Sequence, residues 1–265
     1  MDSTFFLGAR TLIDVNSKIR KLYYNKKYYF SFNRKVKKKN YWSLKKDPDG
    51  KIRDRLKNHK KEKSLFIQNN ISLIKQIYKL KVKNFIDVGC GPGYLLSNFQ
   101  NIMDVYGIEK DTNAIKIAER YGKIFNFDLD KPFEIKKKFD LVVCYHLIEH
   151  IKKPENLIKN LKKIIKPKKY IIIGTPDFDC YMARKFKNKF RLLNDLTHVS
   201  LFSLDSILRF LRDFNFEIVN VDFPFENTKY FTRKSFKKAF CKVSKDNLVS
   251  PPFYGNFITI TAKIK

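Results

Sequence analysis

The stretch that decides the fold is Phe85-Ile86-Asp87-Val88-Gly89-Cys90-Gly91-Pro92-Gly93-Tyr94. A short apolar run leads into glycines at every second position, and helical spacing follows. This order predicts a strand, a tight turn and a helix, because glycine allows backbone angles that other residues avoid and lets a ligand lie against the main chain. A dinucleotide-binding turn would need a small residue at position 94, where this chain has tyrosine. The turn alone is also compatible with a strand–helix connection that binds nothing.

The same alternation of strand and helix patterns continues toward the C-terminus. Apolar runs predict strands at 84–88, 104–108, 123–127, 139–144, 170–174, 216–221 and 257–264. Helical spacing predicts helices at 63–80, 94–99, 112–121, 154–165 and 204–214. This succession predicts an α/β fold with a mostly parallel sheet and helices on both faces.

Residues 1–60 show no clean periodicity. Tyrosines alternate there with lysines, and Asp47-Pro48-Asp49-Gly50 predicts a turn. We therefore expect a basic and aromatic N-terminal cap over 1–60 and one main domain over 61–265.

Composition limits the class of protein. The 265 residues are 43% hydrophobic, which is enough for a core and excludes a wholly disordered chain. No apolar run approaches the ~20 residues of a membrane-spanning helix, so we expect no membrane insertion. The first ten residues do not resemble a secretory signal, which favours a cytoplasmic location.

The formal net charge is +30, and residues 1–63 hold 20 Lys and Arg against 6 Asp and Glu. Such an excess either attracts phosphate groups or is solvated surface lysine, and both interpretations stay open.

The cysteines and histidines do not predict a metal centre. Cys90, Cys144, Cys180 and Cys241 are widely spaced and are expected to be reduced thiols. His146 and His150 are four residues apart, but Glu149 directly precedes the second histidine, unlike the H-E-x-x-H zinc motif. We therefore expect no metal.

Acidic residues follow successive predicted strands. Glu109 comes 109 − 89 = 20 residues after Gly89, and Asp128 follows the third strand. A carboxylate at position 109 can accept hydrogen bonds from both ribose hydroxyls of an adenosine. Asp111 is better placed than Glu109 to cap the next helix, so the acids together indicate a ligand at this sheet edge.

The G-x-G-x-G spacing, with Asp87 ahead of it and Glu109 and Asp128 after it, resembles the S-adenosylmethionine site of class I methyltransferases. The similarity covers 84–177 in motifs and 60–265 in arrangement. It implies a Rossmann-like seven-stranded sheet with an antiparallel last strand, S-adenosylmethionine as donor and S-adenosylhomocysteine as product. It also implies cofactor contacts at Asp87, Gly89, Cys90, Gly91, Gly93, Tyr94, Glu109, Lys110, Asp128, Leu129, Cys144 and Tyr145.

Methyl transfer requires alignment of the reacting atoms and a group that takes the acceptor's proton. We expect His198 to be this base or orienting residue, with His146 as the second choice. His198 could equally be a contact at a helix entry. We interpret His59 as solvated, and Glu149 and His150 as structural.

The region around 47–56, with Trp42 upstream, resembles the caps of bacterial methyltransferases encoded with capsule and lipopolysaccharide genes, as do 175–180, 197–203 and 251–257. This implies an acceptor that is a phosphorylated or nucleotide-activated precursor of a surface polysaccharide, of sugar or phosphoramidate type. The expected acceptor contacts are Trp42, Arg53, Arg55, Asp177, Thr197 and Tyr230. The arginines could instead only pair with neighbouring aspartates and fold the cap.

Two other functional classes remain open. An RNA methyltransferase would use the same donor site and the basic surface. A non-catalytic adenosine-binding protein would keep the glycine turn without transferring a methyl group. The oligomeric state cannot be predicted from these patterns.

Overall fold

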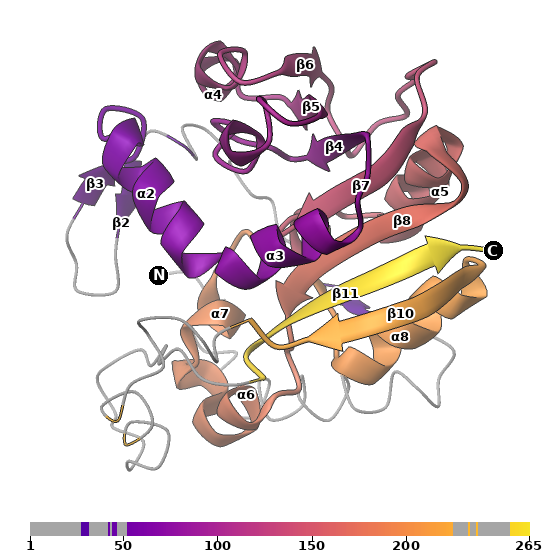
Figure 1. The fold of residues 1–265 in the computed structure, drawn as a ribbon. Coiled ribbons are helices and arrows are strands. Elements are labelled where there is room, and N and C mark those ends of the chain that lie inside the picture. Colours follow the sequence, from indigo (N-terminus) through magenta and orange to yellow (C-terminus); the bar gives the residue numbers. More distant parts are fainter. Residues whose placement is uncertain are drawn as a thin grey trace.

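The computed structural model describes residues 28–31, 42, 44–46, 52–224, 233, 237 and 255–265. Its centre is a seven-stranded sheet in the order β10-β11-β8-β7-β4-β5-β6 (Figure 1). The strands are β4 (Asn84–Val88), β5 (Asp104–Glu109), β6 (Lys123–Asn126), β7 (Phe139–Tyr145), β8 (Ile165–Pro176), β10 (Phe216–Asp222) and β11 (Phe257–Ile264). The pairs from β8 to β6 are parallel, and β11 is antiparallel to both β8 and β10. The predicted Rossmann-like sheet with an antiparallel last strand is confirmed.

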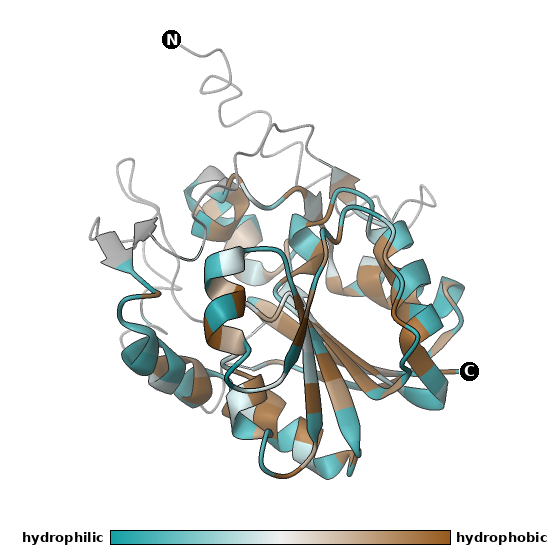
Figure 2. Cartoon of the chain, turned by 90° about the horizontal axis from the view of Figure 1, so that it is seen from above, coloured by the Kyte–Doolittle hydropathy of each residue, from teal (hydrophilic) through white to brown (hydrophobic). Residues whose placement is uncertain are grey.

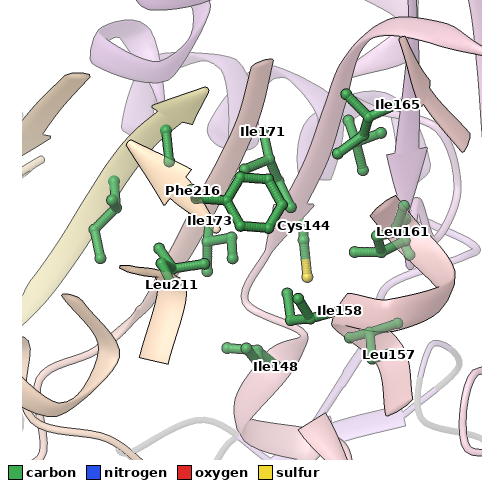
Figure 3. Packing of buried hydrophobic residues seen from close by; sticks show 14 of the residues in the cluster. Cys144, Ile148, Leu157, Ile158, Leu161, Ile165, Ile171, Ile173, Leu211 and Phe216 are labelled. Atoms are coloured by element: carbon green, nitrogen blue, oxygen red, sulfur yellow. The ribbon is translucent and has the colours of Figure 1, made fainter. Parts of the chain in front are cut away.

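The central strands are apolar on both faces. In β7, Leu141 and Val143 pack on the side of α3 (Ile71–Lys79), whereas Val142 and Cys144 pack on the opposite side. That second side is covered by α5 (Pro154–Ile164) and α8 (Leu204–Asp213), whose apolar residues meet the strands (Figure 3). The strands are brown and the outer helix faces mostly teal in Figure 2. Burial on both faces is what a parallel sheet between helices requires.

The helix expected over 63–80 is two helices, α2 (His59–Asn69) and α3. The break is at Asn70, whose side-chain amide donates to the Phe66 carbonyl at 2.7 Å while its backbone N–H bonds to the Ile67 carbonyl. A side chain that bonds to a nearby backbone carbonyl competes with continued helix. The prediction of one continuous helix was therefore wrong.

The helix expected over 94–99 shortens to the 3₁₀ turn η2 (Leu96–Asn98). The Ser97 hydroxyl and the Asn98 amide both donate to the Tyr94 carbonyl, at 2.8 and 2.9 Å. These bonds occupy an acceptor that an α-helix would offer to a backbone N–H. The helix predicted over 112–121 is the shorter α4 (Thr112–Ala118).

Residues 177–203 form a segment that the sequence patterns did not resolve. It contains α6 (Tyr181–Phe186), η4 (Lys187–Lys189), α7 (Arg191–Asn194) and β9 (Ser200–Leu201). Most of its buried apolar side chains form a separate hydrophobic cluster, whereas Phe202 packs in the core with α5 and α8. The separate cluster consists of Phe178, Cys180, Met182, Ala183, Phe186, Phe190, Leu192, Leu193 and Leu201. β9 pairs with β1 (Phe30–Ser31), so part of the expected cap is joined to this segment.

The described part of the cap also includes an antiparallel hairpin of β2 (Leu44–Lys46) and β3 (Ile52–Asp54). The turn expected at Asp47–Gly50 falls between these strands, outside the described residues. Cys90, Cys144 and Cys180 are buried free thiols, and Cys241 is also outside the described residues. Among the described helices, none has the length and apolar character needed to cross a bilayer.

Candidate cofactor and acceptor site

The glycine turn connects β4 to η2 at the carboxyl edge of the sheet. Gly89, Gly91 and Gly93 have φ values of +78°, +53° and +76°, a region that disfavours residues with a Cβ. The N–H groups of Gly89 and Cys90 both donate to the Ile108 carbonyl, at 2.8 and 3.0 Å. The turn is thereby fixed against the end of β5.

Glu109 is the last residue of β5 and is buried against this turn. One carboxylate oxygen accepts the Gly91 N–H at 2.9 Å, and the other accepts the N–H groups of Lys110 and Asp111 at 2.8 and 3.0 Å. Asp111 caps α4 by accepting from Asn113 and Ala114. The carboxylate of Glu109 is therefore already oriented beside the glycine turn.

Two further acids lie at neighbouring positions. Burial and the charge of Glu109 raise the pKa of Asp87 to about 7. Burial alone would raise the pKa of Asp128, but the Asp130 N–H and the Lys110 ammonium, which is 3.5 Å from the carboxylate, lower it. Asp128 is therefore a half-buried anion, whereas Asp87 is a buried acid. Leu129, next to Asp128, is buried.

Trp42 covers the glycine turn. A Cβ placed on Gly91 would come within 2.3 Å of the indole ring, so the ring fits only against glycine. The Arg55 guanidinium lies over the same indole, 4.9 Å from its centroid. These two predicted acceptor contacts thus lie at the turn predicted to bind the cofactor.

Tyr94 begins the chain beyond the turn and packs against Phe66 of α2, with ring centroids 6.1 Å apart. Its buried hydroxyl has no hydrogen-bond partner among the described residues, and burial raises the pKa of Tyr94 to about 12. A buried polar atom without a partner is uncommon and suits a site that takes a polar ligand.

The end of β7 lies beside the end of β4, because the two strands are paired in parallel. Cys144 is buried in the core beneath α5, and burial raises the pKa of its thiol (Figure 3). The Tyr145 ring lies against Gly174 of β8, where a Cβ would be 2.2 Å from the ring. The Cys144 sulfur is therefore packed in the core and not exposed at this edge of the sheet.

His146 follows β7 with a left-handed φ of +52°. Its backbone N–H donates to the Gly174 carbonyl at 2.8 Å, and its ring lies between Tyr145 and Phe257, with centroid distances of 4.4 and 5.0 Å. The side chain is 39% exposed, and Nδ1 is 3.6 Å from an oxygen of Glu149. An accessible imidazole is therefore fixed at the carboxyl edge of the sheet, directly after β7.

Glu149 lies in the 3₁₀ turn η3 (Ile148–His150) and is only 1% exposed. Burial would raise the pKa of Glu149, but the hydrogen bond with His146 and the nearby His150 and His198 lower it. The Thr175 hydroxyl donates to its second oxygen at 3.3 Å.

A family profile described as "Methyltransferase domain" matches residues 57–221, more than half of the chain. The chain belongs to this methyltransferase family.

Curated relatives support the same assignment. The chain is 32% identical over 117 residues to a ubiquinone biosynthesis O-methyltransferase of Coxiella burnetii, a match that covers 40% of this chain and 50% of the relative. A protein of the same name from Rickettsia bellii is 32% identical over 97 residues, a match that covers 34% of this chain and 40% of the relative. The chain spans about half the length of the curated relatives it matches.

Solved structures show the same fold. A methyltransferase of Thermotoga maritima, described as S-adenosylmethionine-dependent and a possible histamine N-methyltransferase, aligns with a TM-score of 0.57 at 16% identity, covering 80% of this chain and 98% of that one. Magnesium protoporphyrin IX methyltransferase of Synechocystis, with bound S-adenosylhomocysteine, aligns with a TM-score of 0.51 at 15% identity. This alignment covers 75% of this chain and 83% of that one. The S-adenosylhomocysteine bound in the second structure is what S-adenosylmethionine becomes when it gives up its methyl group. None of these matches is to a capsule or lipopolysaccharide enzyme, so that resemblance stays a prediction.

The two histidines expected to act on the acceptor occupy different environments in this methyltransferase. His198 is 5% exposed, and its Nδ1 lies 2.6 Å from the Leu192 carbonyl. Its ring packs 4.9 Å from His150 and 5.5 Å from Phe178. Of the two, His146 is the one that faces solvent.

The remaining predicted acceptor contacts are only partly described. Asp177 follows β8, and burial raises its pKa to about 7. The Thr197 hydroxyl donates to Asp195 at 2.6 Å. Arg53 is described only as backbone in β3, and Tyr230 lies outside the described residues.

Sequence reasoning missed the role of Glu149 as the residue where the three histidines converge. The adjacent Glu149-His150 pair at a strand exit was the available signal, but its interpretation was only structural. The approach of His198, 198 − 149 = 49 residues later, depends on the path of the 177–203 segment, which no local pattern specifies.

Proposed function

We propose that the enzyme transfers the methyl group of S-adenosylmethionine to a hydroxyl oxygen of a small-molecule acceptor, and that His146 contacts that hydroxyl. The observation that carries this proposal is the exposed His146 imidazole at the β7 exit, backed at 3.6 Å by the buried Glu149 carboxylate. Such a pair orients one ring nitrogen and leaves Nε2 as the nitrogen that can face an acceptor.

The residues that would bind S-adenosylmethionine are inferred from the acidic side chains around the glycine turn. We infer that Glu109 accepts the ribose hydroxyls, because its carboxylate is oriented beside the turn at Gly91. Asp128 would accept from the adenine amino group, and Asp87 would lie near the positively charged methionine part. The buried hydroxyl of Tyr94 gives this site a further polar group.

The chemistry needs little activation, because the donor supplies a methyl group already bound to a positive sulfur. The acceptor oxygen forms a bond to the methyl carbon as the carbon–sulfur bond breaks and its electron pair stays on sulfur. The hydroxyl proton passes to His146 Nε2. Glu149 and the Gly174 carbonyl hold the residue in position through its ring and its backbone N–H.

Oxygen is the proposed acceptor atom because the curated relatives are O-methyltransferases by name. Their similarity covers 40% of this chain or less, so it supports a reaction type and not a particular acceptor.

A second candidate keeps the reaction but places a phosphate or diphosphate on the acceptor, as in a nucleotide-activated precursor of a surface polysaccharide. The Arg55 guanidinium stacked on Trp42 at the glycine turn supports it, since an aromatic ring and a cation together suit a nucleotide.

A methyl-transfer assay tests both candidates. The enzyme is incubated with S-adenosylmethionine and, separately, small hydroxylated aromatics, nucleotide-linked sugars or RNA, and methylated products are identified by mass spectrometry. We expect an O-methylated small molecule. His146→Ala should lower turnover at least ~100-fold with donor affinity nearly unchanged, and His59→Ala is the remote control. A methylated nitrogen, methylated RNA alone, or full activity of His146→Ala would overturn the proposal.

A further inference from the structure

We propose that Glu149, His150 and His198 bind one divalent ion of the first transition series, such as Zn²⁺ or Co²⁺. Each of the three side chains offers a ligand atom, and these atoms all lie within 4.8 Å of one another. Two imidazoles and one carboxylate are a donor set that suits this group of metals.

The orientation of the two imidazoles supports metal binding. His150 Nδ1 lies 2.9 Å from the Thr197 carbonyl, and His198 Nδ1 lies 2.6 Å from the Leu192 carbonyl. A carbonyl only accepts, so each Nδ1 carries the hydrogen and the lone pair of a neutral ring is on Nε2. Metal-bound histidines commonly show this pattern, in which a backbone acceptor holds the distal nitrogen.

The backbone around the three residues is tied together from both sides. The Val199 N–H donates to the Glu149 carbonyl at 2.8 Å, and the Ser200 hydroxyl donates to the Ile151 carbonyl at 2.6 Å. These bonds join η3 to the chain that carries His198. The ligand atoms are therefore brought together before any ion binds, which reduces the entropy that binding would cost.

Charge gives the third argument. Glu149 is 1% exposed, and a buried carboxylate is costly unless a cation or strong donors compensate it. Its side-chain partners are the Thr175 hydroxyl, 3.3 Å from one oxygen, and His146 Nδ1, 3.6 Å from the other. A divalent ion between the carboxylate and the two Nε2 atoms would compensate this charge and leave coordination positions for water or an acceptor oxygen.

The test is direct binding of Co²⁺, followed by its visible absorption, to the full-length chain after chelator treatment. Asparagine is the informative replacement for each histidine, because its amide can keep the donor to the carbonyl at the Nδ1 position while the Nε2 ligand is lost. We expect one Co²⁺ per chain and at least ~10-fold weaker binding by His150→Asn, His198→Asn and Glu149→Gln. His59→Asn, remote from the three residues, should bind like the wild type.

Two results would overturn the site: no Co²⁺ or Zn²⁺ bound by the wild-type chain, or unchanged binding by folded His150→Asn and His198→Asn. The second result would mean that the ion binds elsewhere on the chain. If a variant does not fold, ¹H–¹⁵N spectra of the wild-type histidines decide. Zn²⁺ must then shift the Nε2 signals of His150 and His198 and leave His59 unmoved, and unshifted signals exclude the site.

Discussion

At the scale of single residues, Glu109 connects the sheet to the glycine turn. Glu109→Gln keeps the size of the side chain but replaces one carboxylate oxygen with a donor, which removes an acceptor for Gly91 and for the ribose that we propose to bind there. We expect S-adenosylhomocysteine binding to weaken by about 1–3 kcal/mol in calorimetry. Glu119→Gln, at an exposed position after α4, is the control. Equal affinities of the two variants would contradict the placement of the ribose.

Gly91 is the residue where Trp42 meets the glycine turn. Alanine at position 91 would have to adopt a φ of +53° and would also clash with the Trp42 ring. Alanine at position 255 would have to adopt a φ of +81°, but its Cβ would have no atom within 4 Å. The difference in urea-unfolding stability between the two variants therefore isolates the ring contact. We expect Gly255→Ala to cost about 1 kcal/mol and Gly91→Ala measurably more. Equal losses would show that Trp42 does not pack on the turn in solution.

Asp87 predicts a pH dependence of stability. Its pKa is raised to about 7 in the folded chain from an ordinary value of 3.8. The unfolded chain therefore loses this proton first, and the group makes folding less favourable as pH rises from about 4 to about 7. Without cofactor, Asp87→Asn should gain stability relative to the wild type between pH 5 and pH 8 in urea unfolding. Asp205→Asn, which changes an exposed residue of α8, is the control and should show no such gain. A stability difference between Asp87→Asn and the wild type that does not change with pH would contradict the raised pKa.

At the scale of elements, α8 carries a reciprocal cap. The Ser203 hydroxyl accepts the Ser206 N–H, while the Ser206 hydroxyl accepts the Ser203 N–H. Ser203→Ala should lower the free energy of unfolding by about 1 kcal/mol, and Ser203→Gly by only a few tenths. Urea denaturation followed by circular dichroism measures both. Equal losses would mean that the cap is not the reason for the effect.

Elements with a strong local signal were predictable from sequence. Pro154 at the start of α5 and the apolar residues at helical spacing after it are sufficient to place that helix. The break at Asn70 was not predictable, because the same apolar spacing continues across it and only a side-chain hydrogen bond interrupts the helix. Residues 177–203 were missed because their short helices pack on one another and not along one sheet face.

Some residues of the candidate site were likewise predictable from the sequence, and others were not. The glycine turn, Glu109 and Asp128 follow strand ends, so parallel topology alone brings them to one edge. Glu149, His150 and His198 meet because backbone hydrogen bonds join η3 to the chain before β9, and these contacts have no local pattern. The relative exposure of His146 and His198 depends on the same packing.

At the scale of the whole molecule, the net charge of +30 opposes compaction. Salt screens repulsion between exposed charges over about 10 Å at 0.1 M. We therefore expect the melting temperature to rise as NaCl increases from ~0.05 to ~0.5 M. Differential scanning calorimetry measures this, with sucrose at matched osmolality as the uncharged control. A melting temperature that falls with NaCl would show that attractive pairs, such as Lys166 with Asp140, outweigh the repulsion.

The separate hydrophobic cluster of residues 177–203 has a consequence for specificity. Because this segment has its own small core, its surface can diverge without disturbing the packing beneath β4 and β5. A protein engineer can therefore exchange this segment between β8 and α8 and test whether the acceptor changes while the packing on the α3 side of the sheet stays intact.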